Sequence, residues 1–140
     1  DRPVPSIVQH YVHGVDRRVF VLGHKILGAY KKVPTDPHEQ RANLSLGANL
    51  EPYALQDVDR EIVSAITPIT MTDGLYFSGL DIMGPEEGGN RENTKLLEVN
   101  VRCPESLTLL EDAAREGTFT SVEDVVAEVV RFAEQLRDEK

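Results

Sequence analysis

The sequence predicts an α+β fold, and three observations lead to this class. Strand-like stretches fill the first third of the chain and return between residues 75 and 101. Helical periodicity covers residues 55–70 and the C-terminal part of the chain, and no repeat or low-complexity linker divides it. With 140 residues the chain suits one domain. We therefore expect residues 1–140 to form a single unit.

The strands of the first third are predicted from β-branched and aromatic residues. Residues 4–12 form an extended run, and residues 18–22 and 25–33 are strand-like. Gly23 and His24 join the last two, and glycine at the first position of a two-residue connection is typical of a hairpin. Residues 34–54 contain three prolines and no periodicity, which predicts a long loop of the kind that often serves function.

Three helices are predicted from apolar spacing. The first covers residues 55–70, and its last turn should be disturbed by Pro68. A shorter helix is expected over residues 105–115. Residues 120–123 (TSVE) have the pattern of a capping box, and the apolar stripe that follows predicts a helix to about Leu136.

Composition excludes several function classes. The 15 Lys and Arg residues against 24 Asp and Glu give a net charge of −9, which leaves no basic stripe for a nucleic acid. No apolar run approaches the roughly 20 residues that a membrane-spanning helix needs. The single cysteine, Cys103, cannot form an internal disulfide, so we expect a cytoplasmic protein. The chain begins with Asp1 rather than Met, as expected for a processed product or part of a longer protein.

The strongest chemical signal lies in two predicted strands, 75–83 and 95–101. Successive side chains of a strand alternate between faces, so Glu98 and Asn100 share one face. If the two strands pair as a hairpin, Asp81 lies beside Glu98. Two carboxylates and an amide oxygen form a donor set that suits Mg²⁺. The alternative is that Glu98 and Asn100 belong to the solvated face of a half-exposed strand.

Two further groups of residues could bind phosphate. Arg41 lies close to Asn43 in the loop, and the planar guanidinium fork suits phosphate or carboxylate. Residues 17–18 (RR) and 31–32 (KK) form a basic cluster in an otherwise acidic protein. This cluster could bind a polyphosphate, or it could protect an exposed edge strand from pairing with another chain.

The segments GLYFSGLDIMG and KLLEVNV resemble the closing hairpin of ATP-grasp carboxylate–amine ligases, with the bacterial-type glutathione synthetases as the closest subgroup. The family pattern is Gly-x-Asp-x-x-Gly, a short turn, then Glu-x-Asn, and it is met by Gly79, Asp81, Gly84, Glu98 and Asn100. VQHYVHGVDRRVFVLGHKILGAYKKV is similar to the adenine hinge and the following hairpin, and QRANLSLGANLEP to the phosphate loop. The turn between the two strands of the closing hairpin is longer here than the family's usual one.

The resemblance implies roles for eleven residues of this sequence. Those implied to contact the nucleotide are Gln9, His10, Tyr11 and Val12 at the adenine hinge, Asp16 near the ribose and Asn43 beside the phosphates. Those implied to act on the transferred phosphoryl group are Arg41 and Arg18. Those implied to bind the metal are Asp81, Glu98 and Asn100.

The resemblance also implies the fold and the reaction. The chain should be the C-terminal part of an ATP-grasp domain, a mainly antiparallel sheet with flanking helices. The cofactors would be ATP and Mg²⁺, with Mn²⁺ as an alternative metal. The enzyme would convert a carboxylate into an acyl phosphate, which an amine then attacks to form an amide; in the closest subgroup these substrates are γ-glutamylcysteine and glycine.

The residues that precede this region in the family, a substrate domain and a Gly-rich subdomain with a phosphate-binding lysine, have no counterpart in residues 1–140. We therefore expect the chain alone to be inactive and to act with the missing N-terminal half or a partner chain. The parent enzyme would be a homo-oligomer. The alternative is a non-catalytic nucleotide-binding or interaction module that keeps the fold.

Overall fold

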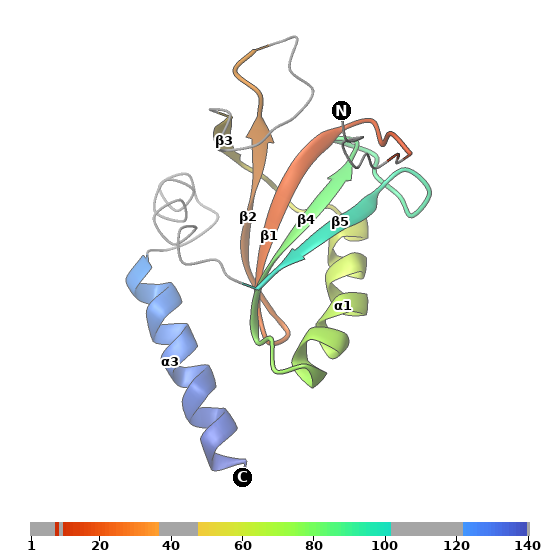
Figure 1. Ribbon diagram of the computed structural model, residues 1–140. Coiled ribbons are helices and arrows are strands. Elements are labelled where there is room, and N and C mark those ends of the chain that lie inside the picture. Colours follow the sequence, from red (N-terminus) through yellow and green to blue (C-terminus); the bar gives the residue numbers. More distant parts are fainter. Residues whose placement is uncertain (1–7, 9, 37–47, 102–121, 140) are drawn as a thin grey trace, which may run out of the picture.

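Five strands form one antiparallel sheet in the order β3-β2-β1-β4-β5, as seen in a computed structural model of the chain (Figure 1). The structure describes residues 8, 10–36, 48–101 and 122–139. The strands are β1 (Val15–Leu22), β2 (Lys25–Val33), β3 (Asn49–Pro52), β4 (Phe77–Gly84) and β5 (Lys95–Asn100). Two long helices, α1 (Asp57–Thr72) and α3 (Val122–Asp138), accompany the sheet. Neither described helix has the length and apolar character to cross a bilayer.

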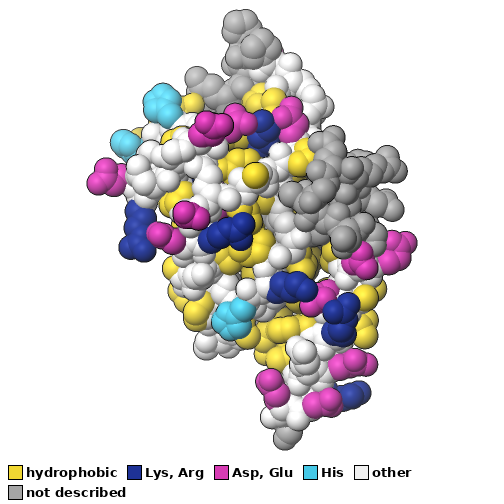
Figure 2. Space-filling model, turned by 180° about the vertical axis from the view of Figure 1, so that it is seen from behind, with side chains coloured by type: hydrophobic (Ala, Val, Ile, Leu, Met, Phe, Trp, Pro, Cys, Tyr) yellow, Lys and Arg dark blue, Asp and Glu magenta, His cyan; other side chains and the backbone are white. Residues whose placement is uncertain are grey.

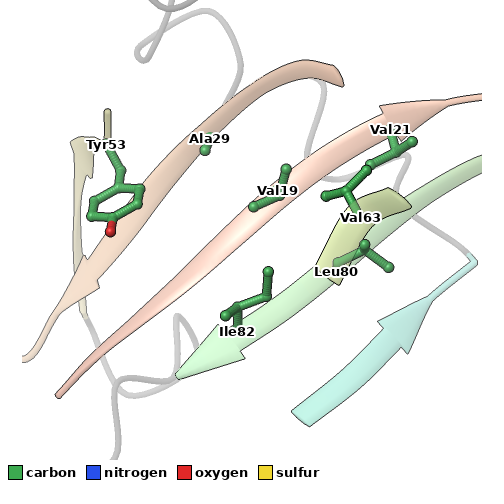
Figure 3. Close-up of a cluster of buried hydrophobic side chains, with 7 residues drawn as sticks. All are labelled: Val19, Val21, Ala29, Tyr53, Val63, Leu80 and Ile82. Atoms are coloured by element: carbon green, nitrogen blue, oxygen red, sulfur yellow. The ribbon is translucent and has the colours of Figure 1, made fainter. Parts of the chain in front are cut away.

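One hydrophobic core lies between the sheet and α1. Alternate residues of β1 and β4 point to this face, and Val63 of α1 packs against them (Figure 3). The buried members are Val19, Val21, Ala29, Tyr53, Val63, Leu80 and Ile82. Apolar residues of α1 that are partly buried, Ile62 and Ile66, extend the contact. The helical spacing of these residues is what brings one stripe of α1 onto the sheet.

The opposite face of the sheet packs against α3. Phe20 and Tyr30 are fully buried there and contact Val125 of the helix. The helix also reaches the hairpin between β1 and β2. A Cβ atom built on Gly23 would lie 2.5 Å from the Phe132 ring, and Lys25 Nζ lies 2.8 Å from Glu128 Oε1. The hairpin and α3 are therefore in close contact.

The predicted α+β class, the antiparallel sheet and the β1–β2 hairpin are confirmed. β1 begins at Val15, three residues before the predicted start. The prediction of a loop throughout residues 34–54 is wrong at its end, because residues 49–52 form β3 and pair with β2. A strand of four residues at the sheet edge is too short to produce a clear alternation in the sequence.

The helix predicted over residues 55–70 runs from Asp57 to Thr72, and Pro68 does not end it. Proline removes the hydrogen bond to the carbonyl four residues earlier, here that of Ser64. Both residues lie on the exposed side of α1, where water can satisfy that carbonyl. Val8 and residues 10–12 of the predicted extended run belong to no strand, and the helix predicted over residues 105–115 lies outside the described residues.

Candidate functional site

A network of charged side chains occupies the sheet face that packs against α3. Arg18 of β1 is directly opposite Asp81 of β4 in the sheet register, and Asp16 of β1 is opposite Lys32 of β2. Arg18 and Asp16 point to the same face as Phe20, because they are separated from it by even numbers of residues. Three neighbouring strands therefore place two acids and two bases together.

Asp81 is paired with two cations at once. Arg18 binds it through two parallel hydrogen bonds, Nε to Oδ1 at 2.6 Å and Nη2 to Oδ2 at 2.7 Å. Lys32 Nζ donates to Asp81 Oδ2 at 3.0 Å and also to Asp16 Oδ2 at 3.0 Å. Asp81 and Lys32 are each only 6% exposed. The bidentate geometry and the low exposure make this a strong, well-defined arrangement.

The same network shifts the pKa values of its two acids, Asp81 and Asp16, in opposite directions. Burial by itself raises the pKa of Asp81, but the hydrogen bonds from Arg18 and the charge of Lys32 outweigh it, and the pKa lies below the ordinary aspartate value. Burial also raises the pKa of Asp16, and there Lys32 does not compensate fully. Asp81 is therefore held firmly as a carboxylate, whereas Asp16 takes up a proton more readily.

Glu98 and Asn100 of β5 lie beside Asp81 as the sequence predicted. Asp81 is paired with Glu98 in the register of β4 and β5, and Gly79 with Asn100. With the Asn100 amide oriented to satisfy both neighbours, its nitrogen donates to Glu98 Oε1 at 2.9 Å and its oxygen accepts from Arg18 Nη2 at 3.1 Å. The three candidate ligands thus lie on one face of one hairpin.

The oxygen atoms of this group are suited to a cation. Asp81 and Asn100 both direct an oxygen to the same guanidinium group, that of Arg18, so these oxygens converge on one positive charge. Carboxylate and amide oxygens are the ligands that Mg²⁺ prefers. The donor set therefore fits Mg²⁺, provided that Arg18 moves away from Asp81. Within the described residues no group of three or more His, Cys, Asp or Glu side chains could hold a metal, so the site depends on the amide of Asn100.

The basic cluster seen in the sequence is divided between the two faces of the sheet. Arg18 and Lys32 belong to the site, whereas Arg17 is fully buried on the α1 face and pairs there with Asp59 at 2.8 Å. β1 is the central strand and β2 lies next to it. Protection of an exposed edge strand is therefore the wrong explanation for this cluster. Figure 2 shows that basic and acidic side chains are intermixed on the face seen from behind.

A cavity of about 260 Å³ opens beside Asp16 and Lys32, at one end of β1 and β2. Gly14, Val33 and Met83 also line it. Asp16 is the residue that the family resemblance assigns to the ribose, so the cavity adjoins the position expected for a nucleoside. Its walls combine apolar side chains with charged groups, as ligand sites commonly do.

The remaining predicted site residues are only partly described. His10, Tyr11 and Val12 lie just before β1, and Tyr11 is 56% exposed with its ring edge against His13 at a centroid distance of 4.5 Å. Gln9, Arg41 and Asn43 lie outside the described residues. From the sequence, Lys32 is assigned to a basic cluster and to no site of its own. Its even spacing with Tyr30 on β2 is the signal that places it on the site face.

Solved structures with the same fold are ATP-grasp ligases. The chain is similar to the D-alanine–D-alanine ligase from Bacillus anthracis, with a TM-score of 0.59 and 13% identity over 92% of this chain and 42% of that one. It is also similar to the ATP-grasp ligase PsnB complexed with a phosphomimetic variant of minimal precursor, Mg and ADP, with a TM-score of 0.56 and 18% identity over 89% of this chain and 35% of that one. These likenesses define the class of fold.

The sequence comparison gives the family within that class. A family model described as prokaryotic glutathione synthetase, ATP-grasp domain, matches residues 2–115, and the chain belongs to this family. Among curated relatives it is 36% identical over 104 residues to the glutathione synthetase of Synechococcus elongatus and 32% identical over 102 residues to that of Anaplasma centrale. The matches cover 72% and 71% of this chain but only 29% and 30% of those enzymes.

Proposed function

We propose that this chain is the C-terminal part of an ATP- and Mg²⁺-dependent ligase that joins a carboxylate to an amine, as a glutathione synthetase does. The observation that carries the proposal is the arrangement of three side chains on one hairpin: Asp81 and Asn100 each direct an oxygen to the Arg18 guanidinium, and Glu98 lies beside both. Membership of the glutathione synthetase ATP-grasp family supports the same proposed function. By analogy with the relatives, the carboxylate substrate is γ-glutamylcysteine, the amine is glycine and the compartment is the cytoplasm.

In this proposal the ion-pair network exchanges partners when the nucleotide binds. The phosphates attract Arg18 and Lys32, which now neutralise Asp81. Asp81, Glu98 and Asn100 are the residues that would hold Mg²⁺ once these cations have left Asp81, and the ion would supply positive charge at the phosphates. Arg18 and Arg41 then stabilise the charge that spreads over the phosphoryl oxygens during transfer to the substrate carboxylate. Gln9, His10, Tyr11 and Val12 hold the adenine, Asp16 lies near the ribose, and Asn43 lies near the phosphates.

The other proposed partner is the rest of the enzyme. The chain covers about a third or less of the length of the curated relatives that it matches, and we expect the remaining portion to contribute the other wall of the nucleotide site. The chain alone should therefore release no ADP. The parent enzyme is proposed to be a homo-oligomer.

A chimera tests the proposal. Residues 2–115 of this chain, which the family model matches, would replace the corresponding region of the Synechococcus elongatus enzyme. A folded chimera should release ADP over many turnovers only when γ-glutamylcysteine and glycine are both present, and Asp81→Asn or Glu98→Gln should abolish this activity. Arg91→Gln, at an exposed side chain of the same hairpin loop, is the matched control and should retain it.

A second candidate is a module that binds a nucleotide without turnover. The observation that favours it is the complete pairing of Asp81 with Arg18 and Lys32, since a carboxylate satisfied in this way needs no metal. A chimera that is folded and binds ATP but forms no ADP would support this module and contradict the ligase.

A further inference from the structure

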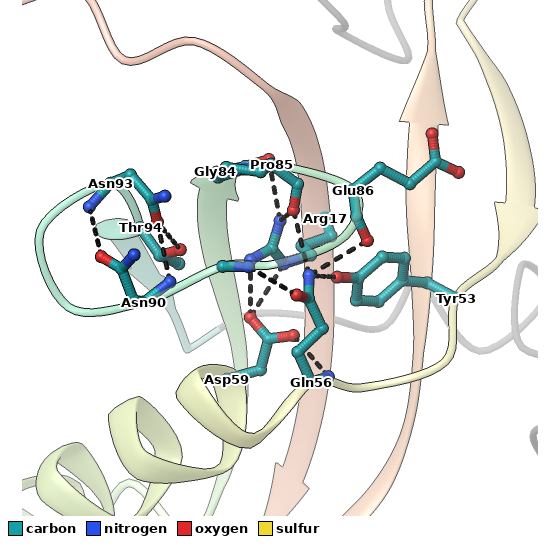
Figure 4. A network of polar contacts seen from close by, with 11 residues as sticks. Arg17, Tyr53, Gln56, Asp59, Gly84, Pro85, Glu86, Asn90, Asn93 and Thr94 are labelled. Carbon is teal, nitrogen blue, oxygen red and sulfur yellow. Dashed lines mark hydrogen bonds and ion pairs between the residues drawn. The ribbon is translucent and has the colours of Figure 1, made fainter.

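The connection between β4 and β5, residues 85–94, is fastened to the rest of the chain by Arg17 and Gln56 (Figure 4). Arg17 Nη1 donates to the carbonyl of Gly84 at 3.0 Å and to that of Pro85 at 3.3 Å. Gln56 Nε2 donates to the carbonyls of Pro85 at 3.0 Å and Glu86 at 3.1 Å. Gln56 Oε1 accepts from the backbone N–H of Gly89 at 2.8 Å.

These two side chains are themselves held in place. Asp59, which is fully buried, accepts from Arg17 Nε at 2.8 Å and from the backbone N–H of Gln56 at 2.9 Å. The Arg17 guanidinium lies 5.0 Å from the centre of the Tyr53 ring, and the Tyr53 hydroxyl accepts from Gln56. Arg17 belongs to β1, Asp59 belongs to α1 and Gln56 caps the start of α1. The loop is therefore attached to the sheet and to the helix.

The attachment matters for the register of the hairpin. Turns of about two to five residues fix the register of a β-hairpin by their own geometry, but residues 85–94 form a much longer connection. A slip of one residue would turn Glu98 to the other face of the sheet, away from Asp81. The pairing of β4 and β5 is already irregular next to this pair, because the register shifts between Asp81 and Ile82. The turn has hydrogen bonds of its own among Asn90, Asn93 and Thr94, and contacts from outside the hairpin add to them in holding its register.

We propose that Gln56, supported by Arg17 and Asp59, is a positioning residue that fixes the register of β4 and β5 and so keeps Glu98 beside Asp81. The consequence for metal binding rests on the proposed function; the consequence for the hairpin does not. The latch defined by Arg17, Gln56 and Asp59 lies on the α1 face of the sheet, opposite the site, so none of its members needs to touch the ligand.

The test uses the 140-residue chain with Gln56→Leu, which is similar in size and removes the side-chain hydrogen bonds but keeps the backbone bond to Asp59. Arg91→Gln is the control, because Arg91 joins the same loop to the same helix through an exposed ion pair with Glu61. Amide hydrogen exchange of each strand and the dissociation constant for Mn²⁺ in the presence of ADP, measured from the EPR signal of free Mn²⁺, are the two readouts.

We expect Gln56→Leu to speed amide exchange in β5 by roughly tenfold, from the loss of several hydrogen bonds of modest net strength. Mn²⁺ should bind about tenfold more weakly, because its ligands no longer face one another. Exchange in β1 and β2 should stay as in the wild type, and Arg91→Gln should change neither readout.

Unchanged exchange in β5, or faster exchange with unchanged Mn²⁺ affinity, would overturn the positioning role. If the wild-type chain alone binds no Mn²⁺ with ADP, the Mn²⁺ affinity is measured in the chimera, where absence of binding would contradict the proposed function. Exchange in β5 decides the register claim in either case. Should Gln56→Leu speed exchange in all strands, Gln56→Glu keeps the acceptor for Gly89 but removes the donor to Pro85 and Glu86, and it must still speed exchange selectively in β5. A uniform effect in both variants would contradict the proposal.

Discussion

Arg18 and Asp81 face each other across neighbouring strands and are joined by two hydrogen bonds of 2.6 and 2.7 Å. A candidate metal ligand is thus already paired with a cation of the same chain, and Lys32 adds a second positive charge at 3.0 Å. In the proposed function this carboxylate would exchange the two cations for a metal. This relationship links the stability of the fold to the proposed binding of a metal nucleotide.

Asp81→Asn should destabilise the chain by about 2–4 kcal/mol near neutral pH, because it leaves Arg18 and Lys32 without their shared carboxylate. The pKa of Asp81 is lowered in the folded state, so its contribution is complete above the unfolded value of about 3.9 and is lost as the pH falls through the folded value. Urea unfolding of both proteins between neutral and acidic pH should show that their difference shrinks below about pH 4.

For Asp16→Asn, the difference in stability from the wild type should change with pH in the opposite direction. The pKa of Asp16 is raised by burial, so its ionised form costs stability once the pH has risen through the folded value, and this cost is absent below the unfolded one. Relative to the wild type, Asp16→Asn should therefore gain stability with rising pH. Parallel slopes for the two aspartate variants would contradict this account of the network.

Lys32→Gln should strengthen the binding of Mn²⁺ in the absence of nucleotide. The ammonium group lies 3.0 Å from Asp81, and its removal takes away a positive charge that repels the metal. For a site with a high effective dielectric constant, we expect the affinity for Mn²⁺ to rise about tenfold. Lys25→Gln, which removes an exposed ion pair with Glu128 elsewhere, is the control. Equal or weaker binding in Lys32→Gln, measured by EPR, would show that Lys32 does not compete with the metal.

The buried pair of Arg17 and Asp59 should show strong coupling in a double-mutant cycle. Both side chains are fully buried, so Arg17→Met alone should cost about 3–5 kcal/mol by leaving Asp59 without its partner. Adding Asp59→Leu should recover part of this loss. Additive losses in thermal or urea unfolding would mean that the pair does not act as a unit.

Gly23→Ala should destabilise the chain more than Gly74→Ala. Both glycines have positive φ values, +57° and +73°, which cost an alanine about 1–2 kcal/mol. Only Gly23 has a neighbour, since its added Cβ would lie 2.5 Å from the Phe132 ring, whereas nothing lies within 4 Å of Gly74. Equal losses of stability would indicate that α3 does not pack against the β1–β2 hairpin in solution.

The sequence predicted the parts of the fold that depend on local pattern. Alternation placed Glu98 and Asn100 on one face, and a glycine turn identified the first hairpin. Alternation implies that Arg17 and Arg18 point to opposite faces of their strand, but the sequence could not reveal that this strand is central, because strand order is a property of the whole chain. The Gln56 latch was missed because it joins residues about 30 positions apart.

The most direct test of the central claim is the position of a bound metal. Mn²⁺ added with ADP to the ¹⁵N-labelled chain should broaden the NMR resonances of β4 and β5 around Asp81, Glu98 and Asn100. Glu98→Gln should remove this broadening without unfolding the chain, because Glu98 is exposed, while Glu92→Gln in the exposed part of the same loop should not. Broadening centred elsewhere, or unchanged by Glu98→Gln, would contradict the assignment of this hairpin as the metal site.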